Sequence, residues 1–359
     1  MNYFDKFAVL FREDTIITKT AAYPLGQAST DILNLSADLL DDLRAKVEAF
    51  NAAKERMFAE TCGDTIHAAQ RKLNDVFDIV RGFPPYRDLK IDWFSAYNLF
   101  PLLYEENHEN WEASMTDGTP ARQDMLEFLR KISELPERLE GFRKQVGLVL
   151  ELYFEELKKR NSSAYASAYA KYYQDMVAGG ALLFHDINAD IEFEQSFPAE
   201  LKFVPIVIKD QEDVPIIAEE TQFGELHMFL FTDFYRGLMH GNAPRRCHNC
   251  GRFFLLTRGY NTCYCNNIAP GETERTCRQV GAHRVAARLW SGDTPLLKEY
   301  AKAINRIKGQ RNSGKISRTD FTVFEDEAKS LVNQVEQGQI ADVEAIRKIH
   351  QISRFRNRK

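Results

Sequence analysis

The sequence of 359 residues contains no uncharged apolar stretch of 18 or more residues, and its first fifteen residues carry charges instead of an apolar core. The first absence argues against a membrane-spanning helix, and the second argues against a secretory signal peptide. We therefore expect a cytoplasmic protein with no membrane partner. In a reducing compartment, neighbouring cysteines bind metal more often than they form disulfides.

Motifs of the common enzyme classes are also absent: the sequence has no GxxxxGK[ST], HExxH, GxSxG or GxGxxG pattern. Its eight histidines are scattered. We interpret Glu225 and His227 as residues of one apolar helix. Because they are two positions apart, they do not share a face of that helix. A protein that is not an enzyme is therefore favoured, and an active site in the helical body that no motif reveals is kept as an alternative.

The formal net charge of −5 conceals two parts of opposite sign. Residues 1–239 hold 25 Lys and Arg against 41 Asp and Glu, whereas residues 240–359 hold 22 against 11. Such an asymmetry indicates that the basic part binds a polyanion or an acidic partner. The acidic part of the same chain is one such partner.

Apolar residues at helical spacing predict a mainly α fold. Helices are expected at about 30–57, 65–80, 121–160, 163–176, 223–239, 282–307, 318–337 and 341–354, with a break at Pro136 that makes two helices of the third. We interpret that pair as an antiparallel helical hairpin inside a bundle. Two short β-branched runs, at 203–208 and 214–217, predict a small β hairpin, and a loose alternation in residues 1–20 predicts another.

Five of the six cysteines lie close together, and only Cys62 stands apart, where a buried and inert thiol is expected. Cys247 and Cys250 form a CxxCG element, which can place two sulfurs on one metal ion. A structural zinc site needs two more thiolates. We choose Cys265 and Cys277, because Cys277 precedes a predicted helix whose dipole stabilises a thiolate. Cys263 is kept as the alternative to Cys265.

The string CxxCGRFF…YC…TCRQVGA resembles an uncharacterised bacterial domain family, whose members carry this zinc module near the C-terminus after a long, mainly helical region. It is more loosely similar to zinc fingers named for a Cys-Gly-Asn-Arg signature. The chain departs from that signature at Arg252 and Phe253 and in the eleven residues between its last two cysteines. The first resemblance implies zinc at the same four cysteines and no established function, and the second hints at transcription.

The predicted organisation is therefore an acidic helical body (1–240) with a hairpin near 203–217, a four-cysteine module of the zinc-knuckle or treble-clef type (241–290), and a basic helical tail (291–359). Residues 240–290 contain eight arginines and no lysine, a composition that suits bidentate contacts to phosphate. Interleaved aromatic residues could stack on bases. The candidate nucleic-acid contacts are Arg246, Arg252, Arg258, Arg278, Arg284 and Arg288.

These features predict a protein that contains structural Zn²⁺ and binds a partner through its arginine-rich module. One hypothesis is a regulator that binds DNA or RNA through residues 240–359. The other is a module that binds another protein, or the chain's own acidic body, with zinc serving only to hold the fold.

Overall fold

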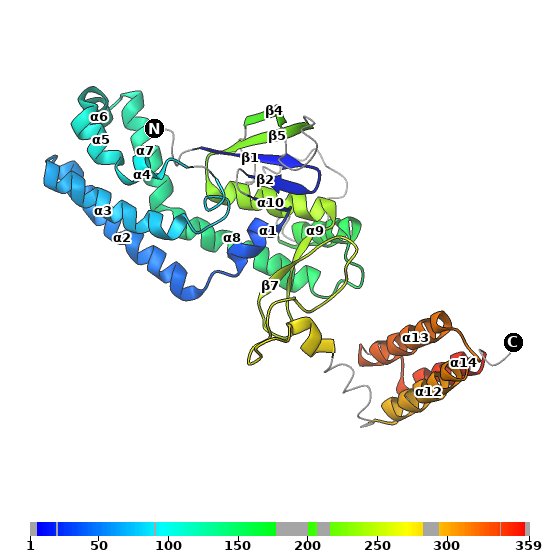
Figure 1. Ribbon diagram of the computed structural model, residues 1–359. Coiled ribbons are helices and arrows are strands. Elements are labelled where there is room, and N and C mark those ends of the chain that lie inside the picture. The colour runs from blue at the N-terminus through cyan, green and yellow to red at the C-terminus, as the bar shows by residue number, and fades with distance from the viewer. Residues whose placement is uncertain are drawn as a thin grey trace. The chain divides into compact units, whose positions relative to one another are not determined.

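The computed structural model describes residues 6–18, 21–89, 91–176, 200–206, 216–282, 294–337 and 339–355. The chain divides into two compact units, one made of residues 1–247 and 251–263 and the other of residues 248–250 and 264–359. The fold is mainly α with a small antiparallel sheet, as the sequence predicts. Figure 1 labels most of the helices and strands and colours the chain from blue at the N-terminus to red at the C-terminus.

Helices form most of the first unit. They are α1 (Gln27–Leu33), α2 (Ala37–Ala59), α3 (Gly63–Val80), α4 (Trp93–Tyr97), α5 (Leu99–Glu106), α6 (His108–Met115), α7 (Pro120–Ser133), α8 (Leu135–Val149), the π-helical turn η1 (Leu150–Phe154), α9 (Ser162–Met176) and α10 (Leu226–His240). In α2, Ser36 accepts a hydrogen bond from the Leu39 amide and starts the helix. The face predicted from helical spacing is buried against α3, with Leu43, Val47 and Phe50 nearly inaccessible to solvent.

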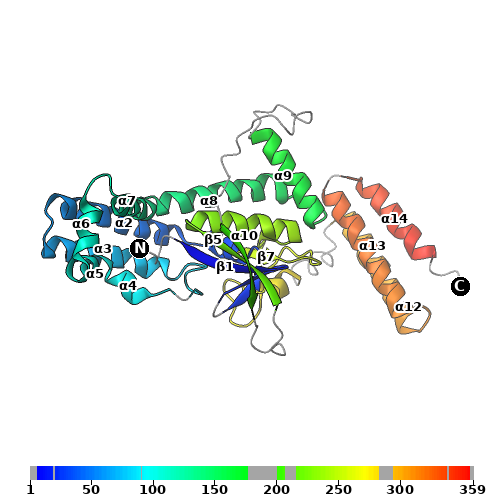
Figure 2. The same cartoon turned by 90° about the horizontal axis from the view of Figure 1, so that it is seen from above.

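The predicted antiparallel hairpin at Pro136 is wrong. Pro136 does lie in the first turn of α8, where its missing amide hydrogen is tolerated. However, Glu134 is the only residue between α7 and α8, and its dihedral angles are helical. One helical residue cannot reverse the chain, so α8 continues onward from α7 (Figure 2). The apolar face predicted along these two helices is buried, but it packs on other helices of the body.

The two predicted hairpins belong to one sheet. Strands β1 (Phe7–Arg12), β2 (Thr15–Ile17), β3 (Ala22–Pro24), β4 (Glu200–Ile206) and β5 (Ile216–Phe223) pair antiparallel in the order β3-β2-β1-β5-β4. Of the predicted strand residues, 207–208 and 214–215 lie outside the described residues. Buried and more exposed residues alternate along β1, and α10 covers the buried face (Figure 1), where Phe229 packs on Phe7 and Phe223.

A buried carboxylate joins α10 to α1. Asp233 accepts hydrogen bonds from the amides of Gly26 (2.7 Å) and Ser29 (2.8 Å) and from the Ser29 hydroxyl (2.9 Å). The backbones approach so closely that a β-carbon on Gly237 would lie 3.1 Å from the Gly26 α-carbon. Burial raises the pKa of Asp233 to about 6, although these hydrogen bonds act in the opposite direction.

The chain continues from α10 into a two-stranded hairpin, β6 (Ala243–Arg246) and β7 (Phe253–Leu256). Farther on, α12 (Pro295–Asn312), α13 (Arg318–Glu336) and α14 (Asp342–Phe355) form a bundle with its own core. Residues 283–293 of the predicted helix at 282–307 lie outside the described residues. No helix in the described part of the chain is both long enough and apolar enough to cross a membrane.

Candidate metal centre

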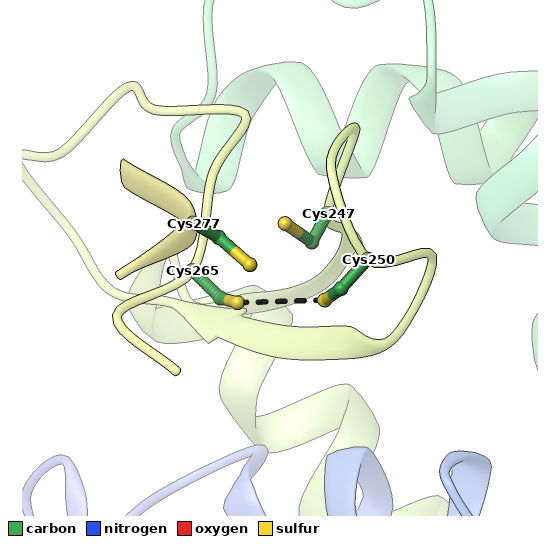
Figure 3. A group of neighbouring side chains, drawn as sticks. All are labelled: Cys247, Cys250, Cys265 and Cys277. Carbon is green, nitrogen blue, oxygen red and sulfur yellow. Dashed lines mark hydrogen bonds between the residues drawn. The ribbon is translucent and has the colours of Figure 1, made fainter. Parts of the chain in front are cut away.

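The first half of the centre is the turn that joins β6 to β7. The amide of Cys247 donates to the Arg252 carbonyl (2.9 Å), and the amide of Gly251 donates to the Cys247 carbonyl (2.8 Å). Gly251 has φ of 74°, a conformation that residues with a β-carbon rarely adopt. This tight turn brings Cys247 and Cys250 to one side of the hairpin end (Figure 3).

The second half is held by backbone pairing between two distant stretches. The Cys277 amide donates to the Asn267 carbonyl (2.8 Å), and the Arg278 amide donates to the Cys265 carbonyl (3.0 Å). Cys277 is the first residue of a helical segment. Thr276 and Gln279 cap that segment, because each backbone amide donates to the other's side-chain oxygen.

The structure brings together the four cysteines chosen from the sequence: Cys247, Cys250, Cys265 and Cys277 have their sulfur atoms within 4.8 Å of one another. The Sγ atoms of Cys250 and Cys265 are 3.7 Å apart (Figure 3). A disulfide requires about 2.05 Å, and all six cysteines are free thiols. A tetrahedron with metal–sulfur bonds of about 2.3 Å has edges of about 3.8 Å. The sulfur spacing therefore fits a four-coordinate metal ion.

The surroundings also suit thiolates. Cys247, Cys265 and Cys277 are buried, with Cys250 half-buried. The side-chain amide of Asn249 donates a hydrogen bond to the Cys277 sulfur (3.3 Å). Hydrogen bonds to coordinating sulfurs stabilise the deprotonated form. Sequence reasoning missed Asn249, although its position between two cysteines of a CxxC element was a usable signal.

The other cysteines lie elsewhere. Cys263 is half-buried and outside the four-sulfur cluster. Cys62 was expected to be buried, but it is exposed at the start of α3, and a hydrogen bond with Thr65 lowers the pKa of its thiol. His248 packs its ring on Tyr264 at a centroid distance of 6.2 Å. His283, a further potential metal ligand close to these cysteines in the sequence, lies outside the described residues.

Two asparagines, which the sequence did not reveal as important, fix the hairpin to the helical body. The Asn34 side chain donates to the Phe253 carbonyl and accepts from the Phe253 amide, both at 2.8 Å. Asn242 donates to the Leu25 carbonyl (3.1 Å) and accepts from the Arg258 amide (3.0 Å). The β6–β7 hairpin is thus a continuation of the body.

The candidate nucleic-acid arginines fall into three groups. Arg252, Arg258 and Arg278 are exposed and form no ion pair with any described residue. Arg246 pairs with Glu151 of η1 at 3.0 Å. Arg284 and Arg288 lie outside the described residues.

The interleaved aromatic residues mostly pack internally. Phe253 lies against the main core. Tyr264 fits so closely over Gly281 that a β-carbon there would lie 2.6 Å from its ring. Phe254 is half-buried, whereas Tyr260 is 58% exposed. Among these residues, Tyr260 offers the most accessible ring for stacking.

A second charged cluster lies at the start of α10. Glu225 and His227 were interpreted as helical residues that do not meet, but Glu225 precedes the helix with extended dihedral angles. Its carboxylate lies 3.2 Å from His227 Nδ1 and 2.9 Å from Arg130. The hydrogen bond with His227, followed by that with Arg130, lowers the pKa of Glu225 to about 2. Glu225 also lines a cavity of about 420 Å³ with Lys131.

Residues 194–354 match the model of a family described as "Family of unknown function (DUF6076)". No curated protein and no solved structure matches the chain. The matched region begins before β4 and ends within α14, so it spans the hairpin of β4 and β5, the cysteine cluster and the C-terminal bundle. This region of the chain is therefore similar to an uncharacterised domain that extends well beyond the cysteine-rich segment.

Proposed function

We propose that the chain is a zinc-containing binding protein, with Zn²⁺ held by Cys247, Cys250, Cys265 and Cys277. The spacing of the four sulfurs supports this proposal most directly. An all-cysteine donor set favours Zn²⁺ over hard cations. Four protein ligands leave no open coordination position for a substrate, so the zinc is structural.

The ligand set is tested by elemental analysis of two serine variants. We expect one zinc per chain in the unchanged protein and in Cys263→Ser, which removes a thiol outside the cluster. We expect Cys265→Ser to lose zinc. Zinc retained in Cys265→Ser and lost in Cys263→Ser would refute the ligand assignment.

We further propose that the module binds nucleic acid through exposed arginines. Arg252, Arg258 and Arg278 support this because they are exposed and have no acidic partner among the described residues. Guanidinium groups donate paired hydrogen bonds to phosphate oxygens, and phosphate contacts provide affinity without sequence preference.

This proposal is tested by measuring the affinity of the zinc-loaded full chain for a random DNA duplex and for RNA at several salt concentrations. Each phosphate contact contributes about −0.9 to the slope of log K against log salt for duplex DNA. The triple variant Arg252→Gln, Arg258→Gln, Arg278→Gln is expected to weaken binding and to make that slope shallower by about 3. Arg275→Gln is the matched control, because Arg275 is already paired with Glu272. Absence of binding at low salt refutes the proposal.

One observation favours the alternative, in which the module docks on the chain's own acidic body. Arg246 reaches Glu151 of η1, and Arg246 also lies over the Phe253 ring at 5.8 Å. Both charged side chains are more than half exposed, so the pair contributes little stability in water. Under this alternative, Glu151→Gln lowers the stability of the hairpin by no more than about 1 kcal/mol, and nucleic acid does not bind.

A further inference from the structure

The C-terminal bundle carries most of its positive charge on α12 (Figure 1). Residues 294–318, which comprise α12 and the turn into α13, contain seven Lys and Arg and one acidic residue, Glu299. Residues 319–337, which comprise the rest of α13 and its C-terminal cap, contain five Asp and Glu and one basic residue, Lys329. The tail that composition describes as basic therefore contains a basic helix and an acidic helix, which share one core.

The core of the bundle determines which side of α12 faces solvent. Four large residues of α12 are buried in that core: Leu297, Tyr300, Ile304 and Ile307. Four basic residues of α12 are exposed: Lys298, Lys302, Arg306 and Lys308. With 3.6 residues per turn, these four fall within one half of the helix circumference, opposite the buried residues. The single acidic residue of α12, Glu299, lies outside that half and is half-buried.

Most of these positive charges have no acidic partner. Lys302 pairs with Glu299 at 2.7 Å. The other six basic residues of 294–318 form no ion pair with any described residue. Four of the six are exposed and also make no side-chain hydrogen bond within the described residues: Lys298, Lys308, Lys315 and Arg318. Their charges are therefore available to an external anion.

The turn after α12 extends the basic surface. The Gly314 amide donates to the Arg311 carbonyl (3.0 Å), and the Lys315 amide donates to the Gln310 carbonyl (2.9 Å). Gly314 has φ of 74°, as is usual where a glycine ends a helix. The Arg311 guanidinium lies over the Phe321 ring of α13 at 4.7 Å. These contacts hold Lys315 beside the C-terminal end of α12, so its charge adds to those of the helix.

The residues between the cations indicate the kind of partner. The uncharged residues exposed on α12 include Asn305, Gly309 and Asn312, and none of the large apolar side chains exposed in the described part of the chain lies on α12. The centre of a protein–protein interface is apolar and depleted of charge. From Lys298 to Arg306, α12 rises about 12 Å, and a DNA duplex carries about seven phosphate charges over that length. The surface therefore suits a phosphate backbone better than another protein.

We propose that the exposed side of α12 and the turn after it bind the phosphate backbone of nucleic acid. Lys298, Lys308 and Lys315 donate to phosphate oxygens, and such contacts provide affinity without sequence preference. The acidic residues of α13 repel phosphate, so the bundle binds with α12 toward the nucleic acid. This inference rests on the proposed binding of nucleic acid and adds a second surface to the arginines of the cysteine module.

The experiment compares four forms of the zinc-loaded full chain by fluorescence anisotropy with a labelled random-sequence DNA duplex at several salt concentrations. They are the unchanged chain and three triple variants. The α12 variant is Lys298→Gln, Lys308→Gln, Lys315→Gln, and the arginine variant is Arg252→Gln, Arg258→Gln, Arg278→Gln. The control variant is Lys144→Gln, Lys329→Gln, Lys348→Gln. Each lysine of the control pairs with a glutamate four positions earlier, so the control removes the same net charge from sites that are already neutralised.

The α12 variant is expected to bind DNA at least about tenfold more weakly at 0.1 M salt and to make the slope of log K against log salt shallower by about 3, because each lost phosphate contact removes about 0.9. The control variant is expected to keep the slope and affinity of the unchanged chain. Glutamine is about as favourable in a helix as lysine, so circular dichroism is expected to show the same helix content in all four forms.

The outcomes distinguish this inference from the proposed function. If only the arginine variant loses affinity, the inference is overturned and the arginine contacts stand. If only the α12 variant loses affinity, the inference holds and the arginine contacts are refuted. Equal losses in the α12 and control variants overturn the inference, because net charge alone would then explain both. It is also overturned if light scattering shows that the unchanged chain self-associates and the α12 variant does not, with equal affinity for DNA. Absence of DNA binding by the unchanged chain overturns both.

Discussion

Removal of the metal is expected to unfold residues 264–282 while leaving the helical body folded. The two halves of the cluster differ in their support. Cys247 and Cys250 end a hairpin that Asn34 and Asn242 tie to the body. The stretch around Cys265 and Cys277 has little core of its own, and its order depends on a few backbone hydrogen bonds and the four sulfurs.

The size of the effect follows from the loops that the metal closes. Fifteen positions separate Cys250 from Cys265, and closing a loop of that length constrains the unfolded chain by about 3 kcal/mol. Cys265 to Cys277 is a second closure of similar length. Losing both costs about 6 kcal/mol, which is comparable to the whole stability of a small domain. The local segment is therefore expected to unfold without metal.

Hydrogen exchange followed by mass spectrometry provides the assay. After chelation, amides of Cys277 and Arg278 are expected to lose protection, and those of α2 and α3 are expected to keep it. Cys263→Ser with zinc serves as the control with unchanged exchange. The reasoning is refuted if chelation leaves residues 264–282 protected, or if α2 and α3 lose protection at the same chelator concentration.

Three further outcomes can be measured by denaturant unfolding. Asn34→Ala removes two hydrogen bonds to Phe253 and is expected to lower the free energy of unfolding by about 2 kcal/mol; a loss below 0.5 kcal/mol contradicts that anchoring role. The pKa of Asp233 is raised from 3.8 to about 6, so its protonated form favours folding. Relative to Asp233→Asn, the unchanged protein is expected to lose about 3 kcal/mol as the pH rises from 3.8 through 6, and a constant difference would contradict this. Phe324→Ala opens a cavity in the separate core of the C-terminal bundle and is expected to cost 3–5 kcal/mol there, with exchange in α2 unaffected; increased exchange in α2 would show that the two cores are coupled.

Local patterns in the sequence predicted much of the fold. The spacing of Leu43, Val47 and Phe50 identified the buried face of α2. The rigidity of Pro136 placed it in the first turn of α8. These features depend on residues a few positions apart, whose relation along a helix is set by its 3.6-residue period.

Long-range pairing could not be read in this way. The sequence predicted two separate hairpins, but β1 and β5 pair in one sheet, with Val9 opposite Thr221. Glu225 was assigned to a helix from the apolar residues around it, but it lies one residue before α10 and therefore reaches His227. Helix ends are decided by capping and packing, which periodicity alone does not specify.

The sequence by itself determined that a cysteine cluster able to hold a metal ion begins at Cys247 and Cys250, because a CxxCG turn brings two sulfurs together through local geometry alone. The sequence did not determine whether Cys263 or Cys265 joins the cluster, because a choice between two residues in a loop depends on where that loop lies. In the tertiary structure, pairing of Cys265 with Arg278 and of Asn267 with Cys277 places the Cys265 sulfur with the other three, and Cys263 lies outside this group. Tertiary structure also divided one arginine-rich composition into exposed cations, an ion pair between Arg246 and Glu151, and the half-buried Arg245, which donates to neutral oxygens of residues 261 and 262. Neighbours that are distant in the sequence determine the surroundings of each charge.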